Sequence, residues 1–193
     1  MSDIFISYRR QDASGSAGRL ADHLEKFFTE KAIFRDVAAI EDGEDFGDAI
    51  KKQLKSCSVF LAVIGPRWLD AVDAKGQRRL DDPEDWVRRE ISAALQRSDI
   101  RVIPVLVDHA PLPGEQDLPD DLKPLLKRNA WPITDAGWDD EIKRLARSIS
   151  KVMGWQRRLR LEWFLNPYGV MLFSLLPLKI NRKSIEINRV RLL

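Results

Sequence analysis

Short apolar runs alternate with longer amphipathic segments along the first 150 residues of the chain. The apolar runs cover residues 4–6, 32–34, 59–64, 102–107 and, more weakly, 130–133. Runs of this length that end in turn residues, as 59–64 ends in Gly65-Pro66, are typical of buried parallel strands. Pro104 has no backbone N–H, so its strand is predicted to lie away from the fully hydrogen-bonded centre of the sheet.

The segments between these runs carry apolar residues at three- and four-residue spacing, which predicts helices with one buried face. Four helices are predicted in this way. The first follows Gly15 and Ser16, and the last is a closing helix over 141–153. Their inward residues are, in chain order, Ala17, Leu20, Leu24, Phe27 and Phe28 in the first; Phe46, Ala49, Ile50 and Leu54 in the second; Val87, Ile91, Ala94 and Leu95 in the third; and Ile142, Leu145, Ile149 and Val152 in the last. A shorter helix is expected around 122–126, whereas residues 70–84 show no usable periodicity. Strands that alternate with helices predict a parallel sheet covered on both faces.

The helix over 85–91 carries the most informative polar pattern. Asp85 is placed to cap the first amides of that helix, and Trp86 and Glu90 are four residues apart and share one face. Ligands of parallel α/β sheets bind beyond the carboxyl ends of the strands, and this helix is expected to begin there. A carboxylate one turn from an indole at that edge is suited to a cationic substrate, although an isolated pair of this kind more often marks a solvated glutamate beside a packing tryptophan.

Charge is unevenly distributed along the chain. The net charge of the 193 residues is +2, but residues 151–193 carry nine lysines and arginines against two glutamates, so the preceding 150 residues are net acidic. An acidic body is a poor binder of nucleic acid, and we expect no nucleic-acid partner. The single cysteine, Cys57, lies in an apolar run, which excludes a disulfide framework and favours a reducing, cytoplasmic compartment.

Targeting and metal signals are weak. The sequence begins directly with a strand pattern, so no signal peptide is expected. His23 on a helix surface and His109 in a loop belong to no ligand cluster, and we predict neither a metal nor a cofactor.

Five separated segments, taken together and in this order, resemble the TIR domain family. They are Asp3 to Arg10, Arg35 to Gly43 (the BB loop of the family), Val59 to Pro66, Asp85 to Ile91 and Val102 to Val107. The resemblance covers residues 1–153 and is strongest to bacterial TIR proteins and to the TIR domain of the SARM-type NADase. It implies a flavodoxin-like fold, with a five-stranded parallel sheet flanked by helices.

The family includes both adaptors and enzymes that cleave NAD+ between ribose and nicotinamide. The resemblance to the enzymes implies that Glu90 is catalytic and that Arg9, Arg10, Asp36 and Glu41 contact the nucleotide. Tyr8, Trp68 and Trp86 are further candidates for substrate binding, and Ile40, Asp42 and Gly43 in the BB loop for contacts between protomers of a homo-oligomer. Five of these residues have an alternative role: Arg9 and Arg10 in local ion pairs, Glu41 as a surface charge, and Tyr8 and Trp68 in packing at the rim.

The chemistry of NAD+ explains why one carboxylate suffices. Glycosidases need a second carboxyl group to protonate the leaving oxygen, but nicotinamide in NAD+ is already cationic and leaves neutral. Glu90 would stabilise the oxocarbenium-like transition state, Trp86 would stack on a ring, and Arg9 or Arg10 would pair with the diphosphate. The resemblance, together with this chemistry, implies an NAD+ glycohydrolase that is activated by self-assembly, acts in bacterial defence or signalling, and yields nicotinamide and ADP-ribose or a cyclic isomer. The competing hypothesis is a non-catalytic adaptor.

The segment 154–193 is predicted to be an extension of the domain. Its apolar stretch, 163–178, is interrupted by prolines and shorter than the roughly 20 residues that a spanning helix needs. Basic clusters at 157–160 and 179–183 flank it, which favours association with a membrane surface through residues 157–183. The alternatives are an oligomerisation segment and the beginning of a further domain.

Overall fold

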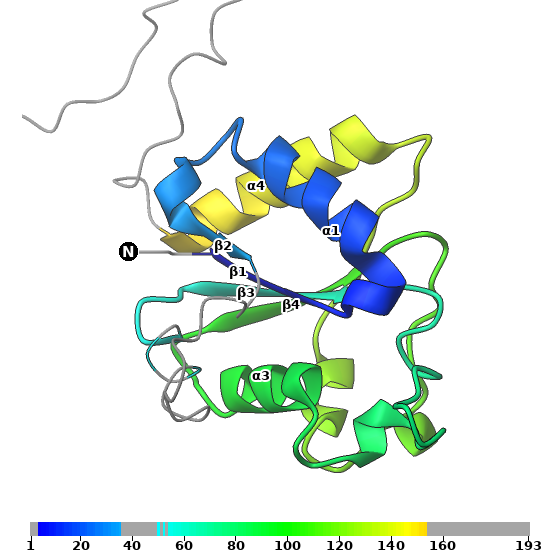
Figure 1. Ribbon diagram of the computed structural model, residues 1–193. Helices are drawn as coiled ribbons and strands as arrows, with labels where there is room; N and C mark the ends of the chain where they lie inside the picture. The colour runs from blue at the N-terminus through cyan, green and yellow to red at the C-terminus, as the bar shows by residue number, and fades with distance from the viewer. Residues whose placement is uncertain (1–3, 36–49, 51, 53, 154–193) are drawn as a thin grey trace, which may run out of the picture. The chain divides into compact units, whose positions relative to one another are not determined.

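The computed structural model describes residues 4–35, 50, 52 and 54–153, and these contain one parallel β-sheet with helices on both faces (Figure 1). The strands are β1 (Ile4–Tyr8), β2 (Ile33–Arg35), β3 (Val59–Ile64), β4 (Arg101–Leu106) and β5 (Trp131–Pro132). Their order across the sheet is β2-β1-β3-β4-β5, and every pair is parallel. This is the flavodoxin-like order, and the predicted five-stranded parallel sheet is confirmed.

The centre of the sheet is formed by the most apolar run of the chain. All six residues of β3 are buried, as expected for a strand covered on both faces. In the register between β1 and β3, Ser7 lies opposite Ala62 and Tyr8 opposite Val63, so the tip of β1 reaches the carboxyl edge of the sheet. Pro104 lies on the part of β4 that pairs with β3 alone, because β5 pairs only with the last two residues of β4.

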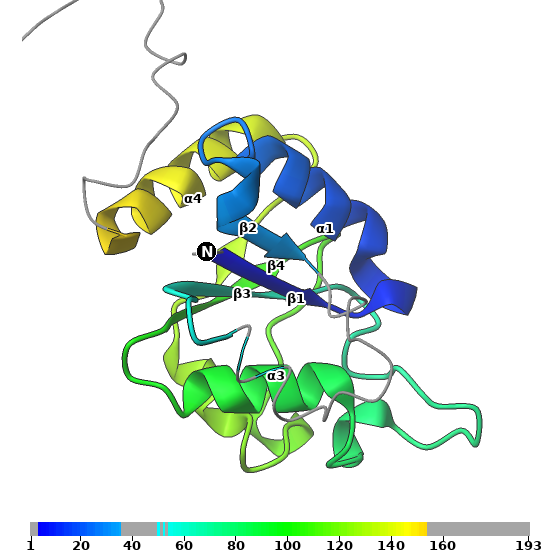
Figure 2. The same cartoon turned by 60° about the vertical axis from the view of Figure 1, so that its left-hand side comes forward.

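In the part of the chain that the structure describes, three long helices cover the two faces of the sheet. α1 (Arg10–Leu24) and α4 (Trp138–Met153) pack on one face, and α3 (Trp86–Leu95) packs on the other (Figures 1 and 2). Four short 3-10 helices lie between these elements, at Glu30–Ala32, Arg79–Asp81, Glu115–Asp117 and Lys123–Lys127. Alternate residues of each strand point to opposite faces, so Ile4 and Ile6 enter the core layer beneath α1 and α4, whereas Phe5 enters the layer above α3.

Three helix details differ from the sequence predictions. α1 begins at Arg10, directly after β1, rather than beyond Ser16, and contains a non-helical residue at Ala13. The helix expected around 122–126 is a 3-10 helix. Val152 is 36% exposed, because the buried stripe of α4 continues from Ile149 to Met153 at a spacing of four instead of three.

Three predicted features lie wholly or partly outside the described residues. They are most of the BB loop, including Asp36, Ile40, Glu41, Asp42 and Gly43; the helix expected to bury Phe46, Ala49, Ile50 and Leu54, of which Phe46 and Ala49 are not described; and the extension at 154–193. Within the described part of the chain, no helix is both long enough and apolar enough to cross a membrane.

Candidate functional site

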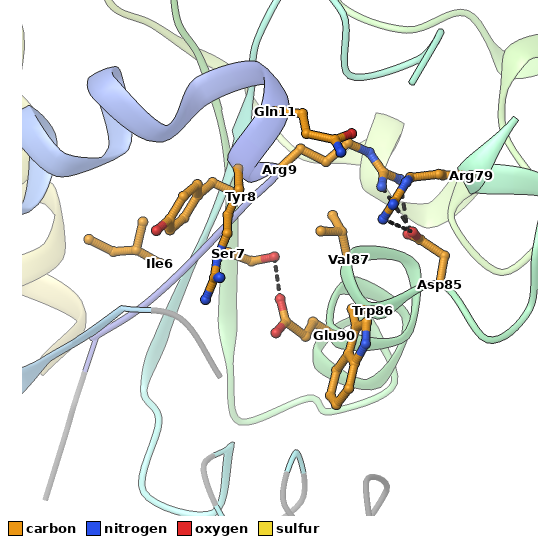
Figure 3. A pocket seen from close by; sticks show the side chains of 11 residues that line it. Ile6, Ser7, Tyr8, Arg9, Gln11, Arg79, Asp85, Trp86, Val87 and Glu90 are labelled. Atoms are coloured by element: carbon orange, nitrogen blue, oxygen red, sulfur yellow. Dashed lines mark hydrogen bonds and ion pairs between the residues drawn. The ribbon is translucent and has the colours of Figure 1, made fainter. Parts of the chain in front are cut away.

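A cavity of about 390 Å³ opens at the carboxyl edge of the sheet, between the tip of β1 and the first turns of α3 (Figure 3). Its volume is in the range of small-molecule sites. The lining residues come from β1, the start of α1, the 3-10 helix at 79–81 and α3; they are Ile6, Ser7, Tyr8, Arg9, Arg10, Gln11, Arg79, Asp85, Trp86, Val87 and Glu90. The carboxyl edge of the sheet, where ligands of parallel α/β sheets are expected to bind, therefore holds a cavity.

Glu90 lies in the wall of this cavity and is only 6% exposed. Val87, Ile91 and Ala94 bury one stripe of α3 against the sheet, and this packing brings Glu90 beside the tip of β1. The hydroxyl of Ser7 donates a hydrogen bond of 2.6 Å to Oε2 of Glu90 (Figure 3). A short bond between a hydroxyl and a carboxylate is strong, so it fixes one carboxylate oxygen at the strand tip.

Asp85 joins the start of α3 to the end of β1. Both of its oxygens accept hydrogen bonds from the two terminal nitrogens of Arg9, each at 2.9 Å, and both side chains are 4% exposed. Asp85 also caps α3 by accepting from the backbone N–H of Arg88 at 3.0 Å, which confirms the predicted cap. Arg9 is thus held in a bidentate ion pair with a local acid, which was the alternative to a nucleotide contact.

The aromatic candidates divide into three positions. Trp86 is 41% exposed and lines the cavity near Glu90 (Figure 3). Tyr8 lines the cavity as well, but it also packs against the core layer beneath α1 and α4. Trp68 is 1% exposed and belongs to the core on the α3 side, so its expected place at the rim is corrected: a side chain buried in this way has no face to offer a substrate.

The turn that follows β3 is hydrogen-bonded to the start of α1. The carboxylate of Asp12 accepts from the backbone N–H groups of Gly65, at 3.0 Å, and Arg67, at 2.8 Å. A Cβ atom on Gly65 would come within 2.5 Å of Oδ2 of Asp12, so a larger residue at this position would displace the Asp12 carboxylate. The turn, which was expected to contribute Trp68 to the site, instead fixes the first turn of α1 beside the cavity.

Sequence reasoning missed three residues of the site. Ser7 and Asp85 lie within recognised segments, but their contacts join positions 83 and 76 residues apart, which local patterns do not show. Arg79 lies in the stretch 70–84, where no periodicity was found, and no signal in the sequence marked it.

In the described residues, no group of three or more His, Cys, Asp and Glu side chains is arranged to hold a metal ion.

Comparison with known families agrees with this architecture. A family model described as TIR domain matches residues 4–146. The chain belongs to the TIR domain family. The match spans all five strands and all three long helices except the last residues of α4, and it includes the whole lining of the cavity in this TIR domain.

Two curated relatives of this chain are named as NAD+ hydrolases. The chain is 32% identical over 123 residues to NAD(+) hydrolase sarm1 of Drosophila melanogaster, a match that covers 63% of this chain and 8% of the relative. It is also 32% identical over 147 residues to NAD(+) hydrolase SARM1 of Danio rerio, which covers 76% of this chain and 19% of the relative. The chain therefore spans less than a fifth of the length of either relative.

Similar solved structures include a metazoan TIR-STING receptor from C. gigas in complex with 2',3'-cGAMP, with a TM-score of 0.46 and 19% identity over 76% of this chain and 40% of that chain. Another is the set of TIR domains in the activated Roq1 resistosome, which recognises the effector XopQ. Its TM-score is 0.43, with 19% identity over 79% of this chain and 83% of that chain.

Proposed function

We propose that this TIR domain cleaves NAD+ between ribose and nicotinamide, with Glu90 as the catalytic carboxylate. The observation that carries the proposal is the position of Glu90: buried, in the wall of a cavity at the carboxyl edge of the sheet, and one turn from the exposed indole of Trp86. The two curated relatives named as NAD+ hydrolases support the same activity. The exposed Trp86 offers a flat apolar surface for a ring of the substrate.

The reaction needs charge stabilisation more than proton transfer. The bond between the anomeric carbon and the pyridinium nitrogen breaks, and nicotinamide leaves as a neutral molecule with the electron pair. Positive charge develops on the ribose, and the Glu90 carboxylate stabilises it electrostatically. Water then adds to the anomeric carbon and loses a proton, which gives ADP-ribose; attack by a group of the substrate itself would give a cyclic isomer.

The burial of Glu90 suits this task. A carboxylate in a largely dry wall interacts with a developing cation more strongly than one in water, because the local dielectric is lower. The hydrogen bond from Ser7 holds one of its oxygens in place before the substrate arrives. Such preorganisation means that little reorganisation is needed as the charge develops.

Replacement of Glu90 tests the proposal directly. Glu90→Gln keeps the shape of the side chain but removes its negative charge, and we expect kcat for NAD+ cleavage to fall by about 100-fold or more. Glu84→Gln is the matched control, because Glu84 is exposed, precedes α3 and does not line the cavity. Nicotinamide release is measured by chromatography, and circular dichroism and thermal melting establish that both variants fold.

Turnover by Glu90→Gln at the rate of the unmutated protein would refute the catalytic assignment.

We further propose that self-association activates the enzyme and that it acts in bacterial defence or signalling. No NAD+ cleavage by the unmutated protein, even at high concentration, would leave the non-catalytic adaptor as the remaining function.

A further inference from the structure

We infer that Arg79, on the 3-10 helix at 79–81, binds the diphosphate of the substrate and makes the cavity selective for phosphorylated nicotinamide ribosides. This inference rests on the proposed function and adds a specific residue to it. The first observation is the distribution of charge in the cavity, which three arginines and two carboxylates line: Arg9, Arg10, Arg79, Asp85 and Glu90. Among the described residues that line the cavity, arginines outnumber carboxylates by one, a balance that favours an anionic ligand.

The positive charge of Arg9 is already compensated. Each of its terminal nitrogens donates one hydrogen bond to Asp85 in a buried bidentate pair, so the guanidinium is already matched by a carboxylate. To release Arg9 toward a ligand would strand the buried carboxylate of Asp85 without its charge partner. The diphosphate contact expected of Arg9 therefore has to come from another cation.

Arg79 is better placed than Arg9. Its nearest carboxylate oxygen among the described residues is Oδ2 of Asp85, at 4.0 Å, which is beyond hydrogen-bond distance, and its Nε makes only a long contact of 3.4 Å to the carbonyl of Val72. Its side chain is 37% exposed, so the guanidinium is accessible from solvent while it lines the cavity. Figure 3 shows it beside Asp85, at the start of α3, whereas Glu90 lies farther along the same helix.

The backbone that carries Arg79 is well anchored. Its neighbour Arg78 donates to Asp81 and to the carbonyl of Asp117, and the same guanidinium holds the pKa of Asp81 below its ordinary value. Arg88 on α3 donates to the carbonyls of Leu80 and Asp81, each at 3.1 Å. Arg79 is therefore presented from a segment that is fixed to α3, the helix that also carries Glu90.

Arg79 and Glu90 line the same cavity at different points along α3. Arg79 lies beside Asp85, at the start of the helix, and Glu90 follows Asp85 by five residues. In a nicotinamide nucleotide one ribose separates the anomeric carbon from its phosphate. A substrate bound with its anomeric carbon at Glu90 and its phosphates toward the start of α3 would bring the phosphates to Arg79.

The test compares three substrates of the full chain that differ in phosphate content: NAD+, nicotinamide mononucleotide and nicotinamide riboside. We expect Arg79→Gln to raise KM for NAD+ about tenfold or more, as the loss of a charge-assisted hydrogen bond does, with kcat changed by less than about twofold. Turnover of the riboside, which has no phosphate, should be equal in the variant and the unmutated protein. Arg101→Gln is the matched control, because Arg101 is exposed at the opposite end of β4, and its kinetics should be unchanged for all three substrates.

An unchanged KM for NAD+ in Arg79→Gln, or an equal loss with the riboside, would overturn the inference while leaving NAD+ cleavage established. Binding of ADP-ribose and of adenosine, measured by calorimetry, separates the two proposals. If the unmutated protein does not cleave NAD+ but binds ADP-ribose in a way that Arg79→Gln weakens, the Arg79 site stands and the proposed function fails. If ADP-ribose binds no better than adenosine and NAD+ is not cleaved, both are refuted.

Discussion

At the scale of single residues, the site depends on how one acid is held. Glu90 is buried, and a buried carboxylate is tolerated only where polar groups compensate its lost hydration. Ser7, itself 2% exposed, supplies one such group through its 2.6 Å hydrogen bond. Ser7 touches the proposed catalytic acid, and we expect it to act as a positioning residue for that acid.

Ser7→Ala tests this role. The variant removes one hydrogen bond to the carboxylate, and we expect kcat for NAD+ cleavage to fall about tenfold, with KM changed by less than about twofold, because the substrate contacts remain. Ser16→Ala is the matched control: it removes a similar bond of 2.8 Å, to Asp108, from a serine that does not line the cavity. Equal kcat values in Ser7→Ala and Ser16→Ala would show that the hydroxyl does not position Glu90.

At the scale of the secondary-structure elements, Asp85 couples β1 to α3. It caps the helix and pairs with Arg9, so the strand end and the helix start form one polar unit in which both charged side chains are buried. Glu90 is on the same helix and contacts the same strand through Ser7. The two contacts together fix the orientation of α3 against the tip of β1.

Asp85→Asn should therefore destabilise the fold. The substitution leaves the Arg9 guanidinium buried without a negative partner and weakens the helix cap, and we expect a loss of about 3 kcal/mol in the free energy of unfolding. Urea titration followed by circular dichroism measures this. Asp120→Asn is the control: it breaks the exposed pair with Lys123 and should leave the urea midpoint unchanged. An equal urea midpoint in Asp85→Asn and Asp120→Asn would count against the coupling of β1 to α3 through Asp85.

At the scale of the whole molecule, the described lining of the cavity is partly exposed to solvent, as the side chains of Trp86 and Arg79 show. A partly open site is less effective at excluding water, so closure by a neighbouring protomer is expected to raise activity. We predict that NAD+ cleavage per molecule rises over a hundredfold range of protein concentration. Initial rates, measured together with particle mass by light scattering, check this, and a constant rate per molecule would argue for an active monomer.

The sequence predicts the sheet well and the side-chain contacts less well. The run 59–64 coincides with β3, because a strand buried on both faces is apolar at every position. Trp68 was misplaced because a large aromatic residue after a strand fits the core and the rim equally well in sequence. Arg79 was missed because its role depends on the contacts of Arg9 and Asp85, and such long-range partners leave no periodic signal.

The central claim is that this TIR domain breaks the bond between ribose and nicotinamide in NAD+. Its most direct test is incubation of the unmutated protein at high concentration with NAD+, with the products identified by mass spectrometry. Our account predicts one nicotinamide released for each NAD+ consumed, together with ADP-ribose or its cyclic isomer, and release by Glu90→Gln that is about 100-fold slower or more. Intact NAD+ after prolonged incubation with the folded protein would contradict it.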